Sequence, residues 1–360
     1  MRGNENNQSE LFHTFSIEEL IPSSHPLRRV RSLCEEALKQ LEPVFETMYS
    51  DVGRPSIAPE RLLKSQILIA LYSIRSDALF CETLGYHILF RWFLGMSMSE
   101  AVFDRSTFSK NRERLIDNEV GKEFLAAVVS LAREEGLISS EHFTVDGTLI
   151  EAWASLKSLQ PKAADTTAAE GKKDKGDRNP DVDFRGEKRT NDTHSSKTDP
   201  ESQLYKKGKN RESKLSFLGH SLMENRNGLI IDAMVTAANG SAEREATLQM
   251  LDRQEIEGGT LGADKGYHAE SFIAELRKRK IVPHIAFHKG RLGLDARTTR
   301  HKTYAVSQRK RKLVEQGFGW LKTIAGMRKT TLRGISKTDY TFSIRAAVYN
   351  ILRIRTLCPA

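Results

Sequence analysis

Three carboxylates in this sequence stand where they could do chemistry together. Asp146 lies in the stretch "FTVDGT", and Asp264 lies in "LGADKG", just before a glycine turn. Glu315 is the one acid in residues 297–333, a segment that holds eleven Lys or Arg residues. Solvated helices usually intersperse the two signs of charge. A single carboxylate among so many bases therefore calls for an explanation.

If the three carboxylates met, they would need a cation. At about 4 Å and an effective dielectric near 20, each close pair costs on the order of 4 kcal/mol. Ligation by oxygen alone selects Mg²⁺ or Mn²⁺, and two such ions about 4 Å apart can drive phosphoryl displacement. Spacing alone does not establish the meeting. An Asp at a strand end is more often a turn residue, and Glu315 alone fits an ordinary solvated helix position.

The bases around Glu315 favour a polyanionic partner. The chain of 360 residues carries a formal net charge of +9, which favours nucleic acid first and an anionic membrane surface second. The alternative is a merely basic soluble protein. The side chains expected to hold phosphate beside the carboxylates are Arg309, Lys310, Arg311, Lys312 and Lys322.

A helix through the basic segment would set the geometry of these groups. At 100° per residue, Gln308, Arg311, Glu315 and Lys322 share a stripe about 60° wide. The adjoining apolar stripe, which would dock on a sheet, consists of Val314, Phe318, Leu321 and Ala325. Glu315 would therefore lie at the border between the core and a basic face.

The elements that must position the carboxylates lie in the second part of the chain. Alternating apolar residues predict a strand over 141–153 and a hairpin in 214–239 that turns at Asn227-Gly228. They also predict a short strand that ends at Asp264 and another over 281–287. Helical patterns cover 241–254, 269–280, the basic segment as one long helix, and 338–357. This order predicts an α/β fold in which helices cover a mixed sheet. The order is similar to that of the RNase H-like fold.

The same patterns predict the division of the chain. We expect residues 1–15 to be a disordered tail and 16–136 to be an all-helical N-terminal domain for DNA binding or dimerisation. Residues 137–335 would form the α/β domain that holds the three carboxylates and is similar in element order to the RNase H-like fold, with a C-terminal helix in 336–360 packed on it. Residues 157–213 are charged, small and nearly free of large apolar side chains, so we expect a disordered insertion there.

Several smaller features bear on function. Lys110 and Arg112 lie in a short basic helix that is either a DNA-recognition helix or a solvated helix face. Glu243 and Glu245 are most simply charges at the start of a helix. His268, close after Asp264, could assist proton transfer, although a structural role is the commoner one for such a histidine.

Other classes of protein are disfavoured. The three cysteines are far apart and form no CxxC pair, which argues against a zinc cluster and fits a reducing cytosol. The N-terminal stretch lacks a hydrophobic signal core. No run of about 18 apolar residues is present, so we expect a cytoplasmic protein without a membrane partner.

Four motifs carry a family resemblance. They are "TVDGTLIEAWAS", "LGADKGY", "RKRKLVEQGFGWLK" and "ILFRWFLGMSMSEAVFDRSTFSKNRERL". In these motifs, which span nearly the full length, the chain resembles a DDE transposase of a bacterial insertion sequence. The resemblance implies that Asp146, Asp264 and Glu315 bind metal, with Mg²⁺-dependent cleavage at element ends followed by strand transfer into target DNA.

The family's last motif is Tyr, two residues, Arg, three residues, Glu, six residues, Lys. Arg311, Glu315 and Lys322 match this spacing, whereas Gln308 stands where the Tyr is expected. The resemblance implies that Arg311 and Lys322 contact the DNA ends. It also implies that the protein acts as a homodimer that holds the terminal inverted repeats and the target DNA, and that the DNA-bound protein is associated with the nucleoid. Two alternatives stay open: a catalytically silent DNA-binding protein derived from a transposase, and a metal-dependent nuclease without strand transfer.

Overall fold

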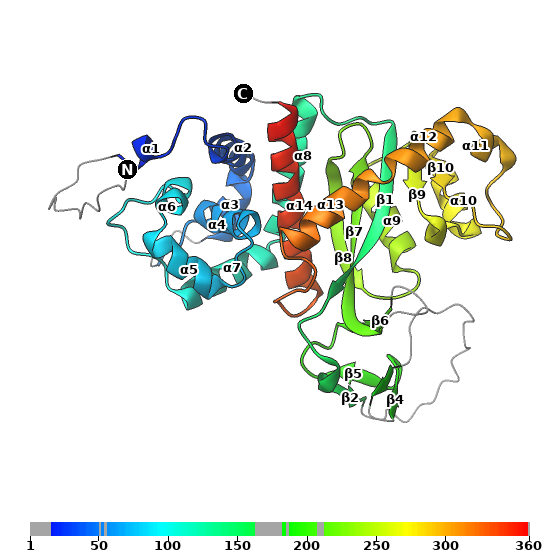
Figure 1. Ribbon diagram of the computed structural model, residues 1–360, viewed down its shortest axis with the longest axis horizontal. Coiled ribbons are helices and arrows are strands. Elements are labelled where there is room, and N and C mark those ends of the chain that lie inside the picture. The colour runs from blue at the N-terminus through cyan, green and yellow to red at the C-terminus, as the bar shows by residue number, and fades with distance from the viewer. Residues whose placement is uncertain are drawn as a thin grey trace, which may run out of the picture.

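The computed structural model describes residues 16–49, 52–53, 56–162, 182–184, 187–206 and 212–358. The predicted tail, residues 1–15, lies outside them. The first part of the described chain is helical, as predicted, and forms the left and centre of Figure 1. Its helices are α1 (Ile17–Leu20), α2 (Leu27–Gln40), α3 (Glu42–Met48), α4 (Pro59–Leu71), α5 (Asp77–Tyr86), α6 (Ile88–Leu94), α7 (Arg105–Asp117) and α8 (Val120–Glu134).

A mixed sheet follows, also as predicted. Its strands lie in the order β10 (Val282–Ile285), β9 (Thr260–Ala263), β1 (His142–Glu151), β7 (Lys214–Glu224) and β6 (Gln203–Tyr205), and β8 (Ile230–Ala237) also pairs with β7. Strand β1 pairs antiparallel with β7 and parallel with β9, and β9 pairs parallel with β10. The β7–β8 hairpin turns through Gly228, whose φ of +69° is one that glycine adopts readily.

Helices cover this sheet. They are α9 (Ala242–Arg253), α10 (Glu270–Lys278), α11 (Ala296–Arg300), α12 (Lys302–Lys310), α13 (Leu313–Thr323) and α14 (Ile335–Leu357), with short 3₁₀ turns η1 (Leu156–Ser158) and η2 (Lys265–Tyr267). In Figure 1, α12 and α13 cross in front of the sheet as one bent diagonal. Within the described residues, no helix has both the length and the apolar character needed to cross a membrane.

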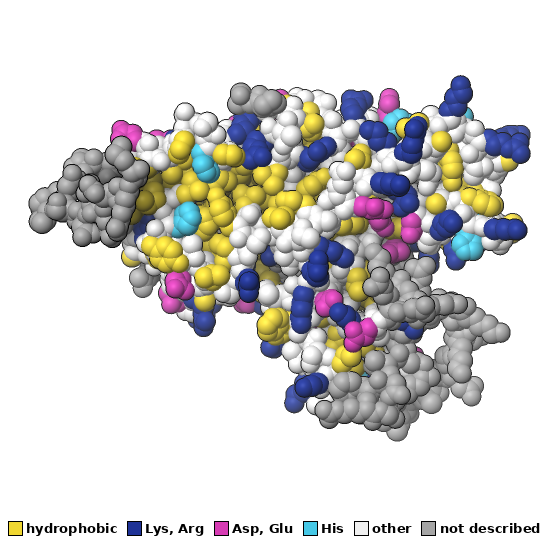
Figure 2. Space-filling model, viewed as in Figure 1, with side chains coloured by type: hydrophobic (Ala, Val, Ile, Leu, Met, Phe, Trp, Pro, Cys, Tyr) yellow, Lys and Arg dark blue, Asp and Glu magenta, His cyan; other side chains and the backbone are white. Residues whose placement is uncertain are grey.

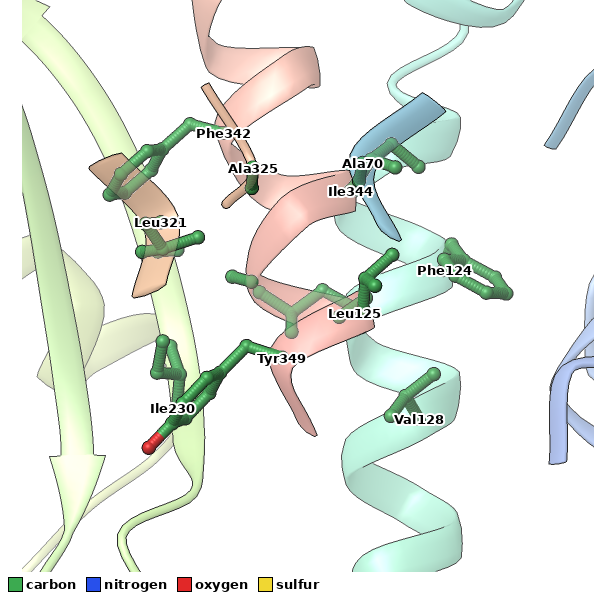
Figure 3. Close-up of a cluster of buried hydrophobic side chains, with 14 of the residues drawn as sticks. Ala70, Phe124, Leu125, Val128, Ile230, Leu321, Ala325, Phe342, Ile344 and Tyr349 are labelled. Atoms are coloured by element: carbon green, nitrogen blue, oxygen red, sulfur yellow. The ribbon is translucent and has the colours of Figure 1, made fainter. Parts of the chain in front are cut away.

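The C-terminal helix α14 joins the helical part to the sheet. Figure 3 shows its apolar side chains between α8, β8 and the α13 region, with Ala70 of α4 in the same cluster. The labelled members of this cluster are Ala70, Phe124, Leu125, Val128, Ile230, Leu321, Ala325, Phe342, Ile344 and Tyr349. Burial of each large side chain stabilises the fold by about 1.5–3 kcal/mol. The core therefore holds α13 firmly against the sheet.

The basic segment is not the single long helix predicted. Extended backbone at His301 separates α11 from α12. Between α12 and α13, hydrogen bonds from the backbone N–H groups of Lys312, Val314 and Glu315 reach back only three residues. Such 3₁₀ geometry turns the chain by about 120° per residue instead of 100°. The predicted stripe from Gln308 to Lys322 is therefore not continuous.

The insertion predicted to be disordered is partly folded. Residues 163–181, 185–186 and 207–211 lie outside the described residues, but short strands form around them: β2 (Leu159–Pro161), β3 (Val182–Phe184), β4 (Glu187–Arg189), β5 (His194–Ser196) and β6. The compositional argument undercounted the apolar side chains that this segment buries, which are Leu159, Leu204 and Tyr205. Polar contacts add to them. Asp199 Oδ1 accepts a hydrogen bond from Gly334 N at 3.2 Å, and Glu201 Oε2 accepts one from Ile335 N at 2.9 Å, at the start of α14.

Candidate active site

Neighbouring parallel strands place the two aspartates. In the β1–β9 pair, His142 lies opposite Thr260 and Thr144 lies opposite Gly262. The same register, continued by two residues, sets Asp146 level with Asp264, which follows directly on β9. Adjacent strands lie about 4.8 Å apart. Two segments that are distant in sequence therefore bring half-buried carboxylates to one side of the sheet.

Local backbone contacts orient both aspartates. Asp264 begins η2, and its Oδ1 accepts a hydrogen bond from Gly266 N at 2.6 Å. Asp146 Oδ1 accepts one from Gly147 N at 2.8 Å.

Glu315 reaches the same place from the helix layer. It is exposed in the first turn of α13, where the helix dipole favours negative charge. Together with Asp146, Asp264 and Arg311, it lines a cavity of about 530 Å³. Figure 2 shows acidic side chains gathered just below the α12–α13 junction, with Lys and Arg side chains around them. The structure thus brings the three predicted acids together with one of the predicted bases.

A fourth carboxylate, which sequence reasoning set aside, lines this cavity. Glu243, in the first turn of α9, shares the cavity wall with Asp146 and Asp264. Beneath them, the phenol of Tyr267 is 1% exposed. Its pKa is held well above the usual value by burial and then by the negative charges of Glu243, Asp146 and Asp264. A helical pattern could not separate Glu243 from Glu245, because only the docking of α9 decides which of them faces the sheet.

The donor set suits a hard divalent cation. The acidic groups supply only oxygen, the ligand that Mg²⁺ and Mn²⁺ prefer. As the side chains are placed, the described residues include no set of three acidic, His or Cys groups close enough to share an ion. Ligation would therefore require the carboxylates to turn toward one another inside the cavity.

The remaining predicted bases lie elsewhere. Arg309, Lys310 and Lys312 are exposed around the α12–α13 junction and do not line the carboxylate cavity. Lys322 is half-buried, two helical turns beyond Glu315. Gln308, at the position of the expected Tyr, donates from Nε2 to the backbone oxygen of His284. It fastens α12 to β10 and does not line the carboxylate cavity.

The two bases predicted in α7 have different surroundings. Lys110 lines a groove of about 950 Å³, together with Thr107, Asn111 and Arg114 on the same helix face. Arg112 points the other way: it is 8% exposed, and its Nη1 lies 2.6 Å from Asp77 Oδ1. Its prediction as a DNA contact was therefore wrong, because the buried ion pair occupies the guanidinium.

His268 has a structural role. It is fully buried, its Nδ1 accepts a hydrogen bond from His288 N at 3.0 Å, and its Nε2 lies 3.2 Å from the backbone oxygen of Leu292. Nδ1 is thus the acceptor, which leaves Nε2 to donate. Both ring nitrogens serve to hold the loop after β10.

Comparisons with solved structures give only weak similarities. A piggyBac transposase synaptic complex with hairpin DNA shares 10% identity at a TM-score of 0.40, covering 92% of this chain and 76% of that one. A pre-cleavage Mos1 transpososome shares 12% identity at a TM-score of 0.21, covering 86% and 80%. A mariner Mos1 paired-end complex with Mg shares 12% identity at a TM-score of 0.20, covering 88% and 84%. No curated protein matches this chain.

Family models match most of the chain. A model described as a transposase domain matches residues 15–114, and the transposase DDE domain model matches residues 163–351. Asp264 and Glu315 lie inside the second match, whereas Asp146 lies between the two. Because the second match alone spans more than half of the sequence, the chain belongs to the transposase DDE domain family.

Proposed function

We propose that this protein is a metal-dependent DDE transposase that cleaves DNA at the ends of its element and joins those ends to target DNA. The observation that carries the proposal is the convergence of Asp146, Asp264 and Glu315, from β1, β9 and α13, on one cavity that Arg311 also lines. Family membership supports it.

The three predicted acids and Arg311 each have a proposed role in the cavity. The three carboxylates would hold two Mg²⁺ or Mn²⁺ ions, which when bound supply charge stabilisation for in-line phosphoryl displacement. Asp146 and Asp264 are oriented by backbone N–H groups next to them. Arg311 would contact a phosphate across the cavity from the strands, since a guanidinium suits bidentate phosphate binding.

The bases on α12 and α13 would guide DNA to this cavity. Arg309, Lys310 and Lys312 lie on the solvent side of the α12–α13 junction, and Lys322 lies further along α13. Each phosphate contact of this kind releases a counterion and adds affinity without base preference. The groove beside Lys110 is the proposed contact of the N-terminal helices with a terminal repeat.

Several broader features are part of the same proposal. They are an RNase H-like catalytic domain over residues 137–335, an N-terminal DNA-binding or dimerisation domain over 16–136, and a C-terminal helix in 336–360. We also propose a bacterial insertion-sequence origin, the cytoplasm as the place of action, and a homodimer on DNA, since two element ends must be held together for joining.

The DNA that flanks the gene supplies the test. Terminal inverted repeats bracketed by a short target duplication are expected, and purified protein with Mg²⁺ should nick DNA that ends in those repeats. Pre-cleaved ends should then join to a target plasmid. Cleavage without joining would instead show a nuclease, and repeat binding without cleavage would show a catalytically silent DNA-binding protein.

A further inference from the structure

We propose that Glu243 is a fourth acidic ligand of the active site and takes part in holding the divalent cation. The inference rests on the proposed metal-dependent function, and it assigns to this side chain a role that the three-acid signature does not include. Three observations support it: the position of Glu243, its close contact with β1, and the electrostatic effect that it and two other acids have on Tyr267.

The position of Glu243 is the first support. Its side chain is half-buried and lines the carboxylate cavity together with Asp146, Asp264 and Glu315. It also lines an adjoining cavity of about 520 Å³. Glu243 therefore forms part of the wall between the two cavities, where an oxygen ligand could face the ion from the α9 side.

The contact with β1 is the second support. A Cβ atom added at Gly147 would lie 2.6 Å from Glu243 Oε1 and 3.0 Å from its Cγ. The carboxylate of Glu243 thus lies directly over the residue that follows Asp146, in space that only a glycine leaves open. This close approach aims the side chain at the sheet, whereas a charge that served only the helix dipole would need no such contact.

The electrostatic surroundings are the third support. The charges of Glu243, Asp146 and Asp264 all act on the buried phenol of Tyr267. Carboxylates that lie close enough to act on one phenol also repel each other, and a cation would offset that repulsion. By contrast, Glu245 lies on the same helix turn and is exposed to solvent.

Glu243→Gln and Glu245→Gln form a matched pair for the test. Binding of Mn²⁺ to the full chain, followed by electron paramagnetic resonance of free Mn²⁺, needs no DNA and no turnover. Loss of an acidic group around a metal commonly costs 10–100-fold in affinity. We expect E243Q to weaken Mn²⁺ binding at least about tenfold, and E245Q to leave it unchanged within about twofold.

Two further variants separate ligation from a helix-start charge. Glu243→Asp keeps the charge at the N-terminus of α9 but withdraws it by one methylene, so it should bind Mn²⁺ as weakly as E243Q while melting near the wild-type temperature. Gly147→Ala keeps every carboxylate but fills the space under Glu243, and it should also weaken Mn²⁺ binding. This variant stands in if E243Q does not fold.

The outcomes distinguish the inference from the proposed function. If Asp146→Asn abolishes Mn²⁺ binding while folded E243Q and E243D bind like the wild type, Glu243 is not a ligand and the three-acid site stands. If the wild type binds no more Mn²⁺ than D146N does, the metal-dependent function itself is overturned. Weak binding by E243Q, E243D and D146N, with normal binding by E245Q, is the result we expect.

Discussion

Asp146 on β1 is level with Asp264, the residue that follows β9, when the parallel register that pairs Thr144 with Gly262 is extended by two residues. Strand pairing fixes the backbone of Asp146, whereas Asp264 is held one residue past β9 as the N-cap of η2, where its Oδ1 accepts a hydrogen bond from Gly266 N. Glu315 and Glu243 come to the same cavity from helices on the sheet. The sheet side of the cavity thus supplies two carboxylates, and the helices supply the others.

The two bases of α7 should behave in opposite ways. Arg112→Ala leaves Asp77 without its partner in a mostly buried site, so the free energy of unfolding should fall by about 3 kcal/mol. Lys110→Ala should change it by less than about 0.5 kcal/mol, because Lys110 is exposed. Urea unfolding measures both effects. A larger loss of stability from K110A than from R112A would overturn this assignment.

Lys322 should contribute one phosphate contact. The slope of the logarithm of the DNA-binding constant against the logarithm of salt concentration should become shallower by about one unit in Lys322→Ala. Lys278→Ala is the control, since Lys278 lies on α10 and is paired with Glu275. An unchanged slope in K322A would show that Lys322 does not contact a DNA phosphate.

Glu201 should stabilise α14 from outside the helix. Its Oε2 accepts a hydrogen bond from Ile335 N at 2.9 Å, and Gly334, at the N-cap, has no side chain to do so. Glu201→Ala should cost about 1 kcal/mol of unfolding free energy, the usual loss for a helix cap. Asp192→Ala, an exposed acid in the same segment, should cost nothing measurable. Equal stabilities of the two variants would show that the cap contributes little.

Acid should loosen the contact between β10 and α12 at His284. This side chain is 1% exposed, its Nδ1 lies 2.7 Å from Ser307 Oγ, and burial lowers its pKa to about 4. The unfolded chain takes up this proton near pH 6.5 and the folded chain only near pH 4. Stability is therefore full above about pH 6.5 and falls by up to about 1.4 kcal/mol per pH unit as the pH drops toward 4.

His284→Asn removes the imidazole that takes up the proton but keeps a polar side-chain atom near Ser307. Unfolding free energies measured between pH 7 and pH 5 should fall less steeply in this variant than in the wild type. Parallel curves for the two proteins would show that His284 does not contribute to the acid sensitivity.

Much of this arrangement follows from local patterns in the sequence. Alternation predicted β1 and the hairpin at Asn227-Gly228. The starts of α5 and α7 are also local, since Ser76 and Asp104 accept backbone hydrogen bonds there. These features depend on neighbours in the chain. The motifs containing Asp146, Asp264 and Glu315 likewise marked three of the acids that the fold brings together.

The rest depends on contacts between distant segments. The level placement of Asp146 and Asp264 results from parallel pairing across a long crossover, which a local pattern does not contain. The choice of Glu243 over Glu245 depends on how α9 docks, and the burial of Arg112 depends on Asp77 from another helix. The predicted stripe from Gln308 to Lys322 was calculated for a regular α-helix, and the tighter turn near Arg311 interrupts it.

The most direct test of the central claim is Mg²⁺-dependent nicking of DNA that ends in the element's terminal repeats. Asp146→Asn, Asp264→Asn and Glu315→Gln should each reduce the rate of nicking by at least about 100-fold, since even groups outside the ligand shell contribute 10–100-fold. Each variant should still bind the repeat DNA, and Glu245→Gln should nick normally. Wild-type nicking by any of the three triad variants would contradict the assignment of these carboxylates as the active site.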